Sequence, residues 1–320
     1  MNLKKVFLFS GQGSQYYGMG KELYENNKIF NFGMNECSEI VSAAIGTSLI
    51  EMLYDPAKKG QPFDQLLYTN PALISVQYSL YRMLQDMNIH PEYFMGYSLG
   101  EITSCIASEM LSLENGLNLS VTIAKMVEEK TPKAAMLAIM SGKEIIVQNP
   151  DIFSACWLIA TNFSESFVVC GLPKDIQTLQ KSLQHEGIVS QQLPVTNGFH
   201  TPLIDAVEND LKAEIQKIQL SKGKIPIISS KDARIKNEVS HNDFWDVLRY
   251  SVNFENAVHT ITNQHDCVFI DLGPSGSLAT SVKYILDADS KSIPLQLINQ
   301  YGKNLQTLEK FTEAFHKYNN

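Results

Sequence analysis

The 320-residue chain has no long apolar run, no paired cysteines and no basic stripe. No apolar run approaches the ~20 residues that a membrane-spanning helix needs. The five cysteines are scattered without a C-x-x-C pair, so the sequence predicts neither a zinc site nor a disulfide framework. A net charge of −8 without a glycine–aromatic motif argues against nucleic-acid binding. We therefore expect a cytoplasmic protein with no metal, no membrane partner and no nucleic-acid partner.

Targeting and docking signals are weak. The first ten residues resemble a signal peptide superficially, but their apolar part covers only residues 6–9, which favours a buried first strand. Lys125, Lys130 and Lys133 lie close together on an otherwise acidic chain. They form either a patch for an acidic partner or the solvated end of a helix.

Apolar β-rich segments alternate with helical patterns, which predicts an α/β fold with a mostly parallel sheet. In the flanking regions, strands are expected at 6–9, 93–97 and 268–272, and helices at 71–87, 99–110, 112–127 and 278–285. In the middle, strands are expected at 136–140, 167–170 and 191–195, and helices at 141–148 and 174–185. The expected strands and helices of the middle region form two β-α-β-like units. They predict a ferredoxin-like subdomain at 130–196, inserted into a large domain made of 1–129 and 197–320.

The pattern G-x-S-x-G occurs at residues 96–100, directly after an apolar run. It is the sequence form of a nucleophile elbow, in which a strand enters a sharp turn that presents a serine and a helix follows. The N-terminus of that helix would stabilise an oxyanion next to Ser98. Because the pattern also arises by chance in a chain with 18 glycines, other residues must support it.

A serine nucleophile needs a base within hydrogen-bond reach. Among the seven histidines, His200 stands out because it lies where the inserted subdomain ends, whereas the others lie in polar or terminal segments. A second glycine-rich segment, residues 11–13, follows the first strand. It lacks both common phosphate-loop patterns, so either an ordinary tight turn or a loop that approaches another backbone remains open.

Five motifs follow one another along the chain. Together, and in this order, they resemble the malonyl-CoA:acyl-carrier-protein transacylase family, including the acyltransferase components of polyketide synthases. They are Gly11-Gln12-Gly13-Ser14-Gln15, Asn70-Pro71-Ala72-Leu73, Gly96-Tyr97-Ser98-Leu99-Gly100-Glu101, Gly198-Phe199-His200 and Asp271-Leu272-Gly273-Pro274-Ser275-Gly276. The resemblance covers nearly the whole chain. It implies an α/β-hydrolase-like large domain with a ferredoxin-like insert.

The resemblance also implies roles for individual residues. Ser98 would be the acylated nucleophile and His200 its base, with the backbone N–H groups of Gln12 and Leu99 forming the oxyanion hole. A backbone carbonyl near Ser229-Ser230 would orient the histidine in place of a carboxylate. No cofactor is implied, because the substrate brings its own phosphopantetheine on a carrier protein or on CoA.

The departures from the family concern the acyl pocket. Members that take malonyl groups have an arginine 25 residues after the serine, and here that position is Ile123. The resemblance also assigns Asn70, Tyr97, Phe199, Asn162 and Ser166 to substrate binding; of these, Asn70, Tyr97 and Ser166 replace glutamine, histidine and glutamine. A free carboxylate facing Ile123 would be unpaired, which favours a neutral acyl group.

Three functions remain open. The first is hydrolysis of stalled or aberrant short acyl groups on acyl carrier protein, as in the proofreading enzymes that accompany polyketide synthases without built-in acyltransferases in antibiotic biosynthesis. The second is a malonyl- or acyl-CoA:acyl-carrier-protein transacylase. The third is a catalytically silent component that docks carrier proteins. We expect a monomer whose partners are the carrier-protein domains of a polyketide synthase.

Overall fold

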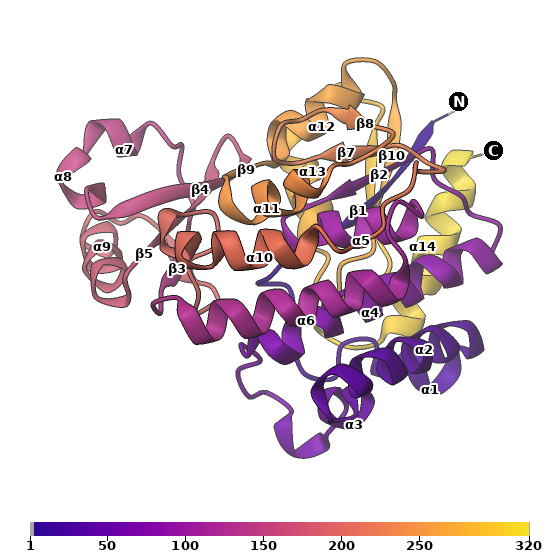
Figure 1. Ribbon diagram of the computed structural model, residues 1–320. Helices are drawn as coiled ribbons and strands as arrows, with labels where there is room; N and C mark the ends of the chain where they lie inside the picture. The colour runs from indigo at the N-terminus through magenta and orange to yellow at the C-terminus, as the bar shows by residue number, and fades with distance from the viewer. Residues whose placement is uncertain (1–2, 320) are drawn as a thin grey trace.

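Two β-sheets organise the computed structural model, which describes residues 3–319 (Figure 1). The larger sheet has the strand order β11-β10-β1-β2-β7-β8. Its strands are β1 (Lys4–Phe9), β2 (Tyr93–Gly96), β7 (Ile227–Ser229), β8 (Ile235–Lys236), β10 (Cys267–Asp271) and β11 (Ile293–Gln296). All neighbours are parallel except β7 and β8, so the predicted α/β fold with a mostly parallel sheet is confirmed.

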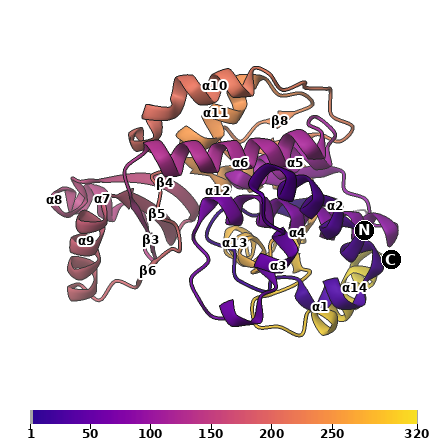
Figure 2. The same ribbon diagram turned by 60° about the horizontal axis from the view of Figure 1, so that its bottom comes forward.

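Helices cover the large sheet on both faces (Figures 1 and 2). They are α1 (Lys21–Asn26), α2 (Lys28–Ile45), α3 (Leu49–Leu53), α4 (Leu66–Asp86), α5 (Leu99–Ala107), α6 (Leu113–Lys130), α10 (Glu208–Ile215), α11 (His241–Arg249), α12 (Phe254–Thr262), α13 (Ser277–Ile285) and α14 (Asn304–Asn319), with 3₁₀ turns at Pro56–Lys58 and Pro202–Val207. The central strands are apolar and buried, as expected for a parallel sheet covered on both sides. No helix within residues 3–319 is long and apolar enough to cross a membrane.

The smaller sheet extends to one side of the molecule (Figure 2). It contains β3 (Ala135–Ile139), β4 (Cys156–Phe163), β5 (Ser166–Gly171), β6 (Ser190–Gln192) and β9 (Val252–Asn253), with helices α7 (Ile145–Gln148), α8 (Pro150–Phe153) and α9 (Pro173–His185). Its order is β6-β3-β5-β4-β9, and β3, β4, β5 and β6 have the chain order and antiparallel pairing of a ferredoxin-like unit. Strand β9 comes from the large domain and pairs with β4, which ties the two sheets together.

The local structure differs from the sequence-based expectations at several places, of which strand β4 and helix α4 are the clearest. Strand β4 was not predicted, because its exposed residues Trp157 and Leu158 are followed by two register shifts that interrupt the period-two pattern. Helix α4 begins at Leu66, so Pro71 lies inside the helix and not in its first turn. Burial of the helix on nearly every side outweighs the one backbone hydrogen bond that proline removes.

Candidate active site

The nucleophile elbow lies between β2 and α5. Ser98 has φ 53° and ψ −117°, a strained conformation that non-glycine residues rarely adopt. A Cβ atom on Gly96 would lie 2.3 Å from the Glu101 backbone nitrogen, and one on Gly100 would lie 1.9 Å from the Phe9 carbonyl oxygen. Both glycines are therefore required sterically, because the turn presses α5 against the ends of β1 and β2.

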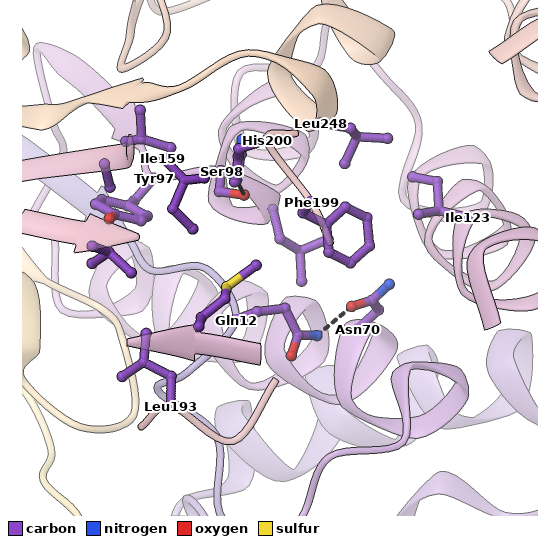
Figure 3. A pocket seen from close by; sticks show the side chains of 15 residues that line it. Gln12, Asn70, Tyr97, Ser98, Ile123, Ile159, Leu193, Phe199, His200 and Leu248 are labelled. Carbon is purple, nitrogen blue, oxygen red and sulfur yellow. Dashed lines mark hydrogen bonds between the residues drawn. The ribbon is translucent and has the colours of Figure 1, made fainter. Parts of the chain in front are cut away.

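His200 lies beside this serine. The distance from Ser98 Oγ to His200 Nε2 is 2.8 Å, within hydrogen-bond range (Figure 3). His200 itself has φ 65°, and its backbone N–H donates to the Leu248 carbonyl at 2.8 Å. The fold thus brings together two residues that are 102 positions apart in the sequence.

The carbonyl that orients His200 belongs to Tyr250, at the C-terminal end of α11. It lies 2.7 Å from His200 Nδ1, and because a carbonyl only accepts, Nδ1 carries the hydrogen. Nε2 is then free to accept the Ser98 hydroxyl proton. The expectation of a carbonyl near Ser229-Ser230 was wrong: the Ser229 carbonyl accepts from the Ala233 N–H, and the Ser230 carbonyl accepts from the Asn253 N–H.

Burial sets the protonation state of the base. It lowers the pKa of His200 to about 4, although the hydrogen bond to the Tyr250 carbonyl works in the opposite direction. At neutral pH the imidazole is therefore uncharged and ready to accept a proton. Burial raises the pKa of every cysteine thiol, so no thiolate competes as nucleophile.

The loop after β1 lies against the elbow. A Cβ atom on Gly11 would lie 3.2 Å from Ser98 Cβ. Gln77 fixes this loop from α4: its Oε1 accepts from the Ser10 N–H at 2.5 Å, and its Nε2 donates to the Ser10 carbonyl at 3.1 Å. Within residues 3–319, the N–H groups of Gln12 and Leu99 donate to no other protein atom. Both remain available for an oxyanion.

A cavity of about 50 Å³ opens at the dyad (Figure 3). Its lining residues are Gln12, Asn70, Tyr97, Ser98, Leu99, Ile123, Met136, Ile159, Ala160, Val168, Leu193, Phe199, His200, Leu248 and Val252. None of these is a lysine or an arginine. Ile123, on α6, and Tyr97 lie on opposite sides of the view in Figure 3. This largely apolar lining suits a small apolar group.

Most polar side chains of the cavity hydrogen-bond to protein partners; among the described residues, Gln12 Oε1 is buried without one. The Gln12 side-chain amide donates to Asn70 Oδ1 and to Thr69 Oγ1, and Asn70 Nδ2 donates to the Ser120 carbonyl at 3.3 Å. The Tyr97 hydroxyl donates to Asn162 Oδ1 at 2.9 Å. These amide and hydroxyl groups are therefore held in fixed orientations beside the serine.

Two predicted substrate-binding residues do not line the cavity. They are Asn162, which accepts from the Tyr97 hydroxyl, and Ser166, whose Oγ accepts from Asn162 Nδ2 at 3.3 Å. The predicted residues Gln12, Asn70, Tyr97, Leu99, Ile123 and Phe199 do line it, together with the dyad. Sequence reasoning missed the wall from the small sheet, namely Met136, Ile159, Ala160, Val168 and Leu193. Nothing in an apolar strand residue distinguishes a cavity wall from a core position.

Two of the three lysines in the cluster contact neighbouring protein groups. Lys130 pairs with Asp210 at 2.6 Å, and Lys125 Nζ donates to the Ala44 carbonyl at 3.1 Å. Within residues 3–319, no group of three or more His, Cys, Asp or Glu side chains is placed to hold a metal ion.

A family model, curated relatives and solved structures all match this chain over nearly its whole length. The model of the "Acyl transferase domain" family matches residues 6–320. The polyketide biosynthesis acyltransferase homolog PksD of Bacillus subtilis is 37% identical over 99% of both chains, and its counterpart BaeD of Bacillus velezensis is 32% identical over 98% of this chain and 97% of its own. Among solved structures, the loading acyltransferase of the avermectin polyketide synthase superposes with a TM-score of 0.88 at 22% identity, covering 97% of this chain and 99% of its own. The transacylase of Coxiella burnetii gives a TM-score of 0.82 at 24% identity, covering 98% and 99%.

Proposed function

This chain belongs to the acyl transferase domain family, and we propose that it hydrolyses short neutral acyl thioesters carried on acyl carrier proteins. The Bacillus relatives are described as acyltransferase homologues of polyketide biosynthesis, which supports a carrier protein of a polyketide synthase as partner. In that setting the enzyme would remove stalled or aberrant acyl groups. Acyl-enzyme chemistry at Ser98 is common to this proposal and to a transacylase.

The observation that supports the substrate choice is the apolar cavity directly at the dyad. Ile123 is fully buried on its wall, and no cationic side chain lines it. A malonyl carboxylate placed there would lose its hydration without gaining a charged partner. An acetyl group brings no charge, and its methyl group gains apolar contact.

The proposed reaction has two halves. Ser98 Oγ attacks the thioester carbonyl while His200 Nε2 accepts the hydroxyl proton, and the N–H groups of Gln12 and Leu99 bind the oxyanion. His200 then returns the proton to the departing thiol. In the second half, a water attacks the acyl-serine, His200 accepts its proton, and the proton returns to Ser98 Oγ as the free acid leaves.

The test measures which acceptor takes the acyl group. Acetyl- and malonyl-loaded carrier protein, and the matching CoA esters, are incubated with the enzyme, and free acid, acyl-enzyme and acyl transfer are followed by mass spectrometry. We expect acetate release from acetyl-carrier protein at the highest specificity constant, with no acyl-enzyme in Ser98→Ala. Faster transfer of malonyl from malonyl-CoA to carrier protein would replace the hydrolase with the transacylase. Absence of acyl-enzyme, free acid and acyl transfer together in the unmodified protein would favour the silent docking component.

A further inference from the structure

The Glu101 carboxyl is buried on the first turn of α5, three residues after the nucleophile. All its hydrogen bonds to the β7–β8 turn reach one oxygen. Oε1 accepts from Ser229 Oγ at 3.1 Å, from Ser230 N and Oγ at 2.8 and 2.9 Å, and from the Lys231 N–H at 3.2 Å. One carboxyl oxygen thus fixes the turn that follows β7 against the nucleophile helix.

The same turn holds the segment that orients the base. The Ser230 carbonyl accepts from the Asn253 N–H at 2.6 Å, and Lys231 Nζ pairs with Asp246 Oδ2 on α11 at 2.9 Å. Tyr250 lies in the sequence between Asp246 and Asn253, and its carbonyl accepts from His200 Nδ1. The connection therefore runs from α5, through one carboxyl and one turn, to the base that faces Ser98.

We propose that Glu101 is a positioning residue for the Ser98–His200 pair: by holding residues 229–231, it fixes the Tyr250 carbonyl and with it the His200 imidazole. Glu101 does not line the substrate cavity, so it acts only through these contacts. The proposal uses the acyl-enzyme step of the proposed function, and it holds for a hydrolase and a transacylase alike.

The ionisation of the Glu101 carboxyl provides a way to test this role, because the acylation rate should then depend on pH. Burial raises the pKa of Glu101 to about 7, opposed by hydrogen bonds from Ser229 and Ser230 and by the charge of Lys236. The other titratable groups around it and the turn are Cys105 on α5, Lys231 and Asp232 in the turn, and Asp243 and Asp246 on α11. The ionised carboxyl is the stronger acceptor. The His200 imidazole, with a pKa near 4, is already neutral above pH 5.5.

The experiment measures the rate of Ser98 acylation by an activated acetyl ester, using rapid quench and mass spectrometry of the acyl-enzyme between pH 5.5 and 8.5. In the unmodified protein we expect the rate to rise through an inflection near pH 7. Glu101→Gln should remove that inflection and lower the rate at pH 8 on the order of 10- to 100-fold, because the base is misplaced. KM should change less than about twofold, since the cavity is untouched.

Two further variants separate positioning from simple loss of structure. Ser230→Ala removes one donor to the ionised carboxyl and should move the inflection to higher pH with a smaller loss of rate. Cys105→Ala, one turn further along α5 and on the same small cavity as Glu101, should leave both rate and inflection unchanged. Thermal melting checks that each variant is folded at the assay temperature.

A Glu101→Gln variant with the unmodified rate and inflection overturns the proposal. So does an unshifted inflection in Ser230→Ala, which stays informative if Glu101→Gln fails to fold. Ser98→Ala is run alongside: acylation of that variant would refute the nucleophile of the proposed function, whereas its absence together with unaffected Glu101→Gln refutes only the positioning role.

Discussion

Replacing Ile123 by arginine should redirect the cavity from neutral acyl groups toward acyl groups with a free carboxylate. Ile123 is fully buried, and its side chain forms part of the cavity wall. The side chains of Gln12 and Asn70, which line the same cavity, are uncharged amides that bond to each other. A malonyl carboxylate therefore finds no charged partner in the unmodified cavity.

The size of the effect follows from that missing partner. An unpaired carboxylate in this space should cost roughly 2–4 kcal/mol, which is about 30- to 1,000-fold in the specificity constant. An arginine at position 123 would offer two parallel charge-assisted hydrogen bonds and remove much of this penalty. Because Ile123 is fully buried on the cavity wall, the longer arginine side chain should also displace the methyl group of an acetyl substrate.

The assay compares kcat/KM for acetyl- and malonyl-loaded carrier protein in the unmodified protein, Ile123→Arg and Ile123→Met. Methionine is the control, because it adds length without charge and adapts to irregular space. The malonyl-to-acetyl ratio should rise at least tenfold in Ile123→Arg only. A ratio near one in the unmodified protein, or an equal rise in the methionine variant, would refute the reasoning.

Two further changes test how the elbow and its buried charges affect stability. Gly100→Ala should destabilise the fold by several kcal/mol in urea melts, because its Cβ would meet the Phe9 carbonyl; Gly46→Ala, at φ 73° with open space around it, should cost only about 1 kcal/mol. Relative to the unmodified protein, Glu101→Gln should gain stability and His200→Ala should lose stability as pH rises from 4.5 to 6.5, each by on the order of 3 kcal/mol.

The pH effects have opposite signs because folding raises the pKa of Glu101 and lowers the pKa of His200. The folded pKa of Glu101 lies above its unfolded value of 4.5, so its stabilising contribution is complete below pH 4.5 and is lost as pH rises through about 7. The folded pKa of His200 lies below 6.5, so its contribution is present above pH 6.5 and is lost as pH falls through about 4. Each variant is therefore compared with the unmodified protein at the same pH, which cancels the contribution of other buried groups such as Asp271. Parallel trends in the two variants, or equal losses in the two glycine variants, would contradict these assignments.

Local sequence was sufficient where short-range sterics decide the structure. Gly96 and Gly100 flank Ser98 because the tight turn leaves no room for a side chain at either position. The five consecutive residues 96–100 were enough to predict this turn. The alternation of apolar strands and helical patterns likewise predicted the parallel sheet. Ile123 was identified as a cavity residue only through its spacing in a related family, and it does line the cavity.

Tertiary structure decided what depends on the meeting of distant segments. Every residue has a carbonyl, so nothing in the sequence marks Tyr250 as the partner of His200; the pairing arises because α11 ends beside β9, which joins the small sheet through β4. The wall formed by Ile159 and Val168 arises in the same way. Strand residues look alike in sequence whether they face a core or a cavity, and only the packing of the two sheets decides which.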